Sequence, residues 1–191
     1  MAGRQRSGGQ TGKAAAIARL LHEECAHLLQ LYSKRESLPS FAAPGGQLVT
    51  LPPLGAQLSP VEKLCFMHAA LSECLRLLNE AIKREDAEFP PEEDEYRTQR
   101  ATVKDRLGHL LLTTERLLMD SKKCAAGVAE VPDVVDNGSF ALKKWILQML
   151  QDLVHWSSQT SETLKSLLME TEKAQGRTRR AANRHKGRLR K

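Results

Sequence analysis

The connections between four segments of periodic apolar residues constrain the fold more than any other feature of this sequence. Apolar residues, mostly leucine, recur at three- and four-residue intervals over residues 13–35, 60–86, 92–122 and 140–172, which predicts four amphipathic helices. The first connection, residues 36–58, is long and holds four prolines, the second, around residues 89–91, is very short, and the third, residues 124–139, is long again. A short connection forces antiparallel neighbours, whereas a long one permits a crossover between parallel helices. We therefore expect an all-α four-helix bundle with up-up-down-down topology and two long crossover loops.

Local signals mark where two of these helices begin. Ser59 is a suitable N-cap, Pro60 suits a first helical turn, and Glu62 completes a capping box. Before the third helix, Pro90-Pro91 ends the preceding segment, and the acidic run Glu92-Glu93-Asp94-Glu95 favours the positive end of a helix dipole. These signals support the same division into four helices.

The charge of the chain is concentrated at its C-terminal end. Nine of the 29 Lys/Arg lie in residues 173–191 without any Asp/Glu, which leaves 20 cations against 23 acids, a net charge of −3, on the rest. We expect a flexible N-terminus over residues 1–12, the bundle over 13–172 and a disordered basic tail over 173–191. Such a tail is expected to bind polyanions by counterion release, heparan sulfate outside a cell or nucleic acid inside one. The alternative is a tail that serves only solubility.

The cysteines do not form a recognisable metal or redox motif. Cys25, Cys65, Cys74 and Cys124 include no C-x-x-C pair, which argues against a zinc or dithiol site. Cys65 and Cys74 lie on one expected helix at about 13 Å along its axis, too far apart to bond. We expect buried free thiols, with a Cys25–Cys124 link as the alternative.

No motif for catalysis or for a cofactor emerges from the sequence. Residues 24–27 supply one Glu-x-x-His motif of a di-iron bundle, but residues 152–155 are a poor second, and the further inward carboxylates are missing. Residues 22–26 begin like a zincin H-E-x-x-H but end in Ala26. His68 falls on the apolar stripe of the second helix and is expected to be a satisfied core or boundary histidine. We therefore expect a protein that is not an enzyme, has no cofactor and works by binding other proteins.

Neither a membrane span nor a signal peptide is evident. No apolar run approaches the roughly 20 residues that a span requires, so we expect no membrane insertion. The first eight residues lack the apolar core of a signal peptide. The chain is thus expected to be made without a leader or to have lost one.

Three short segments resemble the interleukin-6 family of long-chain helical cytokines. Phe140-Ala141-Leu142-Lys143 resembles the F-x-x-K motif that opens the last helix in members that use the leukemia inhibitory factor receptor. Residues 150–156, LQDLVHW, are similar to the last helix of ciliary neurotrophic factor, and residues 38–41, LPSF, to the start of the first long loop of cardiotrophin. The resemblance covers residues 13–172 and points to the subgroup of these three cytokines, while the basic tail departs from it.

The resemblance implies an extracellular cytokine, released from the cytoplasm without a conventional leader. It implies binding to the leukemia inhibitory factor receptor and to glycoprotein 130, with an alpha receptor left open as a further partner, and JAK–STAT signalling in the target cell. Phe140 and Lys143 would contact the first receptor. A second receptor would contact the outward faces of the first and third helices, at Arg19, Glu23, Gln30, Asp105, Leu112 and Arg116.

Two further expectations accompany this assignment. Asn137 begins an N-x-S glycosylation sequon three residues before Phe140, and Arg177-Thr178-Arg179-Arg180 fits a furin-type cleavage pattern. The alternative to a cytokine is an intracellular helical adaptor whose basic tail is a nuclear or nucleic-acid-binding element.

Overall fold

The computed structural model describes residues 3–39, 47–51, 58–89, 94–119 and 138–188, without the side chains of residues 3–8 and 174–188. This part of the chain contains four helices and no strand: α1 (Gly3–Glu36), α2 (Pro60–Glu88), α3 (Glu95–Met119) and α4 (Ser139–Arg188). The prediction of an all-α four-helix bundle is confirmed.

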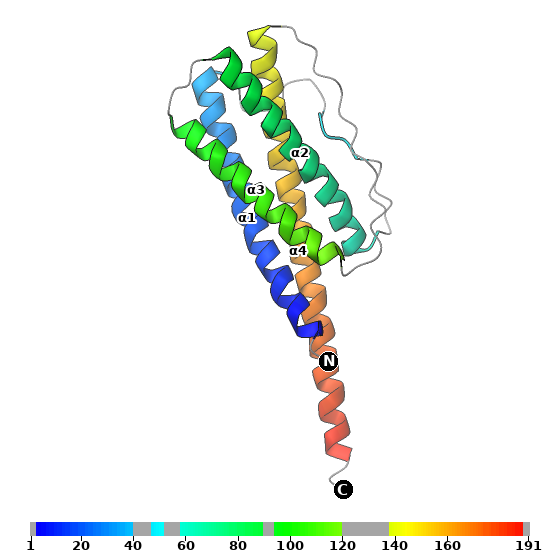
Figure 1. Cartoon of the computed structure of the whole chain (residues 1–191). Coiled ribbons are helices and arrows are strands. Elements are labelled where there is room, and N and C mark those ends of the chain that lie inside the picture. Colours follow the sequence, from blue (N-terminus) through cyan, green and yellow to red (C-terminus); the bar gives the residue numbers. More distant parts are fainter. Residues whose placement is uncertain (1–2, 40–46, 52–57, 90–93, 120–137, 189–191) are drawn as a thin grey trace.

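Each helix of the bundle packs against two others. α1 contacts α3 and α4, and α2 contacts the same two helices, so that α1 and α2 face each other across the bundle (Figure 1). The last turn of α1 meets the end of α2 through Arg35 and Glu85 and the start of α4 through Tyr32 and Lys143. At the opposite end, Gly12 near the start of α1 lies beside Leu168 of α4.

The expected apolar stripes form one core. Its largest fully buried side chains include members from all four helices: Leu21, Leu28, Tyr32, Leu64, Leu71, Leu77, Leu78, Leu107, Leu110, Ile146, Met149 and Leu150. Packing of these stripes against one another, at about 25 cal/mol per Å² of apolar area removed from water, is the main source of stability for the bundle. Ile82, Leu117 and Leu142 pack at its edge and are only partly buried.

The helix starts and ends agree with sequence signals where these are strong. Ser59 caps α2: its hydroxyl accepts from the backbone N–H of Glu62 at 3.3 Å, and its own N–H donates to the Glu62 carboxylate at 2.8 Å. The predicted capping box is therefore confirmed. α1 ends at Glu36, followed by Ser37 in the left-handed region with φ of 53°, a conformation that usually selects glycine at this position.

Two helices are longer than their sequence signals indicated. α1 begins at Gly3 and not at residue 13, although the added stretch contains four glycines, each of which costs a helix about 1 kcal/mol relative to alanine. Thr11 and Ala14 are buried and Gly12 packs beside Leu168, so contact with α4 outweighs that cost. α4 continues to Arg188, past the expected end at residue 172. No proline interrupts residues 173–188, and alanine and arginine are good helix formers.

The cysteines differ from expectation at one position. Cys25 and Cys74 are buried free thiols, and burial raises the pKa of both. Cys65, in contrast, is disulfide-bonded, so the expectation of free thiols is wrong there. The Cys25–Cys124 link is not formed because Cys25 is free, and Cys124 itself lies outside the described residues.

The segment 47–51 is fastened to α4 by two side chains. The carboxylate of Asp152 accepts from the backbone N–H groups of Leu48 at 2.6 Å and Val49 at 2.8 Å, and the indole of Trp156 donates to the Val49 carbonyl at 3.2 Å. Burial raises the pKa of Asp152 in spite of these hydrogen bonds. Asp152 and Trp156, within the segment 150–156 that carries part of the family resemblance, thus hold segment 47–51 against the bundle.

The structure also bears on His68, on membrane spans and on metal sites. The Nδ1 atom of His68 lies 2.8 Å from the Thr114 hydroxyl, so His68 is the satisfied boundary histidine that we expected. Within the described ranges, no helix is long and apolar enough to cross a membrane, and no group of three or more His, Cys, Asp or Glu side chains is placed to hold a metal ion.

Candidate functional site

The first turns of α4 carry the predicted receptor-binding pair in two different environments. Phe140 is 62% exposed, and the ring has the Lys144 ammonium 5.3 Å from its centroid. Lys143 is only partly exposed and points back to the bundle, where its ammonium lies 2.7 Å from the Glu36 carboxylate. Phe140 is therefore available to a partner, while Lys143 already has one within the chain.

Lys143 joins α4 to α1 and α2. Besides the ion pair with Glu36, its ammonium lies 5.2 Å from the ring centroid of Phe89, just after α2. Its backbone carbonyl accepts a hydrogen bond from the Tyr32 hydroxyl of α1 at 3.2 Å. Burial by itself raises the pKa of Glu36, but the hydrogen bonds from Lys143 and Arg35 lower it below its ordinary value. These contacts fix the start of α4 to the rest of the bundle.

A buried carboxylate, Glu85 of α2, is the centre of a larger polar network at the same end of the bundle. Glu85 is 1% exposed and accepts from Arg35 of α1 at 2.7 Å, from the Tyr96 hydroxyl of α3 at 3.1 Å, and from Arg100 of α3. A buried charge is tolerated only when it is paired and hydrogen-bonded in this way.

Two tyrosine rings lie beside this network. The ring centroids of Tyr32 and Tyr96 are 5.3 Å apart, and the Arg35 guanidinium lies 4.5 Å from the centroid of the Tyr96 ring. Burial raises the pKa of both tyrosines, so each stays a neutral hydrogen-bond donor at physiological pH. All four helices thus meet at one rigid end, and the exposed ring of Phe140 lies at its edge.

The sequence did not indicate this network. Glu85, Arg35 and Arg100 were not singled out because charged residues near helix ends usually face solvent. The one available signal was the spacing of Leu78, Ala81 and Glu85, which places a carboxylate on the apolar face of α2.

The six residues of the second predicted face are all exposed, but only some of them are brought together. Arg19 and Glu23 pair along α1 at 2.9 Å. Leu112 of α3 is 55% exposed, and Gln30 and Asp105 are solvent-facing without a contact to one another. Arg116 is the member that approaches the neighbouring helix.

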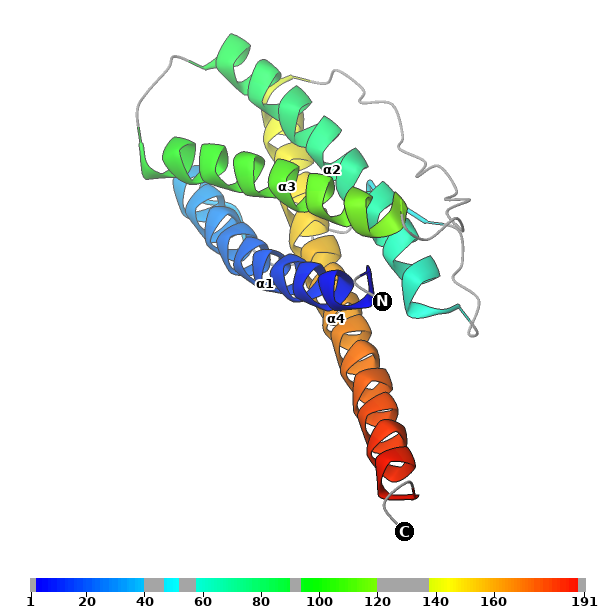
Figure 2. The same ribbon diagram turned by 60° about the horizontal axis from the view of Figure 1, so that its bottom comes forward.

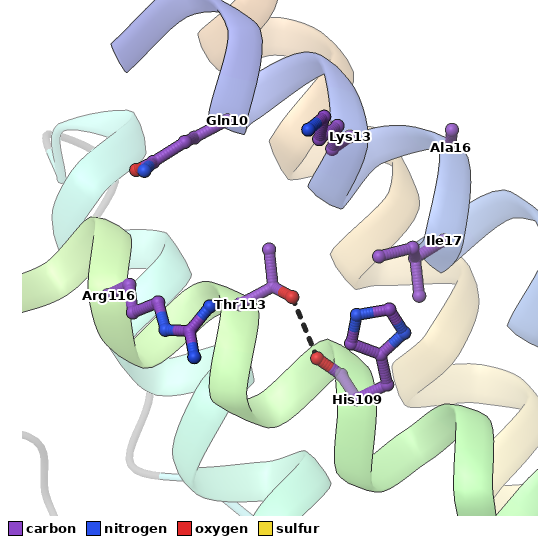
Figure 3. Close-up of a pocket in the computed structure, with 7 residues that line it drawn as sticks. All are labelled: Gln10, Lys13, Ala16, Ile17, His109, Thr113 and Arg116. Atoms are coloured by element: carbon purple, nitrogen blue, oxygen red, sulfur yellow. Dashed lines mark hydrogen bonds between the residues drawn. The ribbon is translucent and has the colours of Figure 1, made fainter. Parts of the chain in front are cut away.

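A pocket of about 520 Å³ lies between α1 and α3, close to the start of α1 and the end of α3. Its lining comes from both helices (Figure 3): Gln10, Lys13, Ala16, Ile17, His109, Thr113 and Arg116. The Thr113 hydroxyl donates to the His109 carbonyl at 2.8 Å, so its hydrogen is used within α3. The lining includes two positively charged residues, Lys13 and Arg116, and no carboxylate.

The predicted glycosylation site, Asn137, lies outside the described residues, although Gly138 and Ser139 of its sequon are exposed just before and at the start of α4. The furin-type pattern at residues 177–180 falls within α4, in the part whose side chains are not described.

No family model matches the chain, and no curated protein matches its sequence.

Proposed function

We propose that this chain is an extracellular helical cytokine that bridges receptor chains of the leukemia inhibitory factor receptor and glycoprotein 130 type and thereby triggers JAK–STAT signalling. The observation that carries the proposal is the exposed ring of Phe140 at the start of α4, next to an end of the bundle held rigid by the Glu85 network. Aromatic side chains, phenylalanine included, are enriched in the buried cores of protein interfaces.

The proposal includes the up-up-down-down topology with two crossover loops. In that topology the last turn of α1 lies with the end of α2 and with the starts of α3 and α4. The contacts of Arg35 with Glu85 and Asp94, and of Tyr32 with Lys143, support it. The pocket that joins the start of α1 to the end of α3, and the approach of Gly12 to Leu168, support it from the other end.

Phe140 and Lys143 have different roles in this proposal. Phe140 is the anchor that enters the first receptor, because most of its ring faces solvent. Lys143 positions α4 through Glu36 and Phe89, and the neighbouring exposed Lys144 is the cation next to the anchor. This assignment changes the role that the F-x-x-K resemblance implies for its lysine.

A second, separate surface is needed for bridging. The outward faces of α1 and α3 are proposed for glycoprotein 130, with Leu112 as the exposed apolar residue and with Arg19, Glu23, Gln30, Asp105 and Arg116 around it. An alpha receptor is left open as a further partner.

The disulfide at Cys65 supports an extracellular location. Disulfides persist in oxidising compartments and are rare in the cytosol, which favours the secreted protein over the intracellular adaptor. The basic tail, in this setting, is proposed to hold the cytokine near heparan sulfate.

The proposal is tested by expressing the full chain in mammalian cells. We expect the protein in conditioned medium, bound to an immobilised ectodomain of the leukemia inhibitory factor receptor, and STAT phosphorylation in cells that carry both receptors but not in cells that lack them. Retention inside the producing cell together with no binding to either ectodomain would reject the cytokine in favour of the adaptor.

A further inference from the structure

The pocket between α1 and α3 lies at the end of the bundle away from Phe140. Figure 2 shows the start of α1 and the end of α3 at the same end, whereas α4, which carries Phe140 in its first turn, begins at the other. Two residues of the lining, Lys13 of α1 and Arg116 of α3, are positively charged and exposed. The pocket is therefore a feature of its own and not an extension of the Phe140 surface.

The two charges of the lining differ from the other charges of the bundle in having no acidic neighbour there. The other arginines with described side chains each form an ion pair, namely Arg19, Arg35, Arg76, Arg84, Arg97, Arg100 and Arg106. Within the part of the chain that the structure describes, Lys13 and Arg116 form no such pair, and no carboxylate lines the pocket. Their N–H groups are available to an anion from outside the chain.

Donor groups from two helices share one end of this pocket. In Figure 3 the amide of Gln10 and the guanidinium of Arg116 lie at the same end, and Lys13 follows Gln10 by three residues on the same side of α1. An arginine offers five N–H donors in a planar fork, a lysine three and a glutamine amide two. A phosphate group presents three strong acceptor oxygens, and the arginine fork matches two of them at once.

The other end of the pocket is less polar. The side chain of Ile17 points toward the ring of His109 across the gap between the helices (Figure 3). The Thr113 hydroxyl donates to the His109 carbonyl at 2.8 Å, so it has no hydrogen left for a ligand. This end suits the apolar or planar body of a ligand whose charged group lies at the end with Gln10 and Arg116.

We propose that the α1–α3 pocket binds a small organic phosphate monoester. The phosphate lies between Lys13 and Arg116 and accepts from both and from the Gln10 amide, while the organic body lies against Ile17 and His109. Near pH 7 a phosphate monoester carries a charge of about −1.5 to −2, which two cations neutralise. A carboxylate or a sulfate ester carries a single negative charge and would leave one cation uncompensated.

The size of the pocket agrees with such a ligand. Its volume of about 520 Å³ lies within the range of about 300–1,000 Å³ of small-molecule sites. The basic tail is not part of this site, and no receptor is needed to form it. Arg116 also belongs to the surface proposed for glycoprotein 130, but ligand binding is measured on the chain alone, so its failure would leave the receptor proposal untouched.

The location of the site is tested by titrating the full chain with phenyl phosphate at constant ionic strength. Amide resonances from two-dimensional NMR report which part of the chain the ligand contacts. We expect shifts in residues 10–17 and 109–116, on the two sides of the pocket. Shifts confined to the basic tail, residues 173–191, would overturn the proposal.

The role of the two cations is tested with a matched pair of variants. Lys13→Ala/Arg116→Ala is compared with Lys34→Ala/Lys104→Ala, which removes the same charge from exposed positions outside the pocket. We expect the first variant to bind phenyl phosphate about tenfold more weakly or worse, and the second to change affinity less than about twofold. Because the tail is the same in both, equal losses would show that only net charge matters and would overturn the pocket.

The class of ligand is tested with three further probes on the parent protein. Phenyl sulfate keeps the ring but carries one charge, and inorganic phosphate keeps the charge but has no organic body. We expect both to bind roughly fivefold or more weakly than phenyl phosphate. Equal affinity for phenyl sulfate would overturn the phosphate, and equal affinity for inorganic phosphate would overturn the organic body. Tighter binding of a phosphoserine peptide, with the same loss in Lys13→Ala/Arg116→Ala, would overturn the small molecule in favour of a phosphorylated protein.

Discussion

Phe140→Ala separates a binding role of this residue from a structural one. A phenylalanine side chain presents on the order of 200 Å², and Phe140 leaves 62% of its surface exposed. Burying that exposed part in a receptor would remove about 120 Å² from water, worth about 3 kcal/mol at ~25 cal/mol per Å². Loss of the ring should therefore weaken receptor binding by about two orders of magnitude. The free energy of unfolding should change by no more than about 0.5 kcal/mol, as for other surface sites.

The assay pairs a receptor-binding titration with thermal unfolding followed by circular dichroism. Met169→Ala is the matched control, because Met169 is 50% exposed on the same helix but lies near the other end of the bundle. We expect Met169→Ala to leave both affinity and melting temperature unchanged. If Phe140→Ala binds the leukemia inhibitory factor receptor as tightly as the parent protein, the anchor is wrong; if its melting temperature falls sharply, the ring stabilises α4 instead.

Three further substitutions test the contacts behind this surface. Lys143→Ala should lower the free energy of unfolding by about 1–2 kcal/mol, because it leaves the Glu36 carboxylate with one partner fewer. The pKa of Glu36 is lowered, so its ion pair stabilises the folded state above the ordinary carboxyl pKa, and this stabilisation is lost as pH falls through the folded-state pKa. On acidification the Lys143→Ala variant should therefore lose less stability than the parent protein. Identical pH profiles of the two proteins in denaturant titrations would contradict this. Asp152→Ala should cost roughly 2–3 kcal/mol and release the backbone N–H of Val49, and an unchanged rate of hydrogen exchange at that amide would exclude the fastening of segment 47–51. Ser37→Gly should raise stability by about 0.5–1 kcal/mol, because glycine adopts the positive φ without strain, and a lower melting temperature would count against it.

Short-range rules predicted those features that depend on neighbouring residues. The recurrence of leucine at helical spacing predicted the four helices whose apolar faces form the core, and the capping box at Ser59 predicted the start of α2. Both rest on contacts within a few residues or on a period that any packed helix must have, so the sequence carries them directly.

The candidate site depended on contacts that no local pattern encodes. The sequence predicted Phe140 and Lys143 as one receptor-binding pair, but in the structure the two side chains have different surroundings. Glu36 and Phe89 contact Lys143, whereas most of the Phe140 ring is exposed to solvent. Those partners are more than 50 residues away along the chain, so their approach follows from the packing of helices and not from spacing.

The sequence by itself determined the helical class, the four amphipathic segments and the concentration of cations in the tail, since composition and periodicity are properties of the chain alone. Only the tertiary structure decided how far α1 and α4 extend, because the glycines before residue 13 disfavour helix until Gly12 and Leu168 pack together. It also decided the state of individual charges. Glu85 is buried and paired with Arg35 and Arg100 because ion pairing depends on which helices become neighbours, and that is fixed by the burial of the shared apolar core.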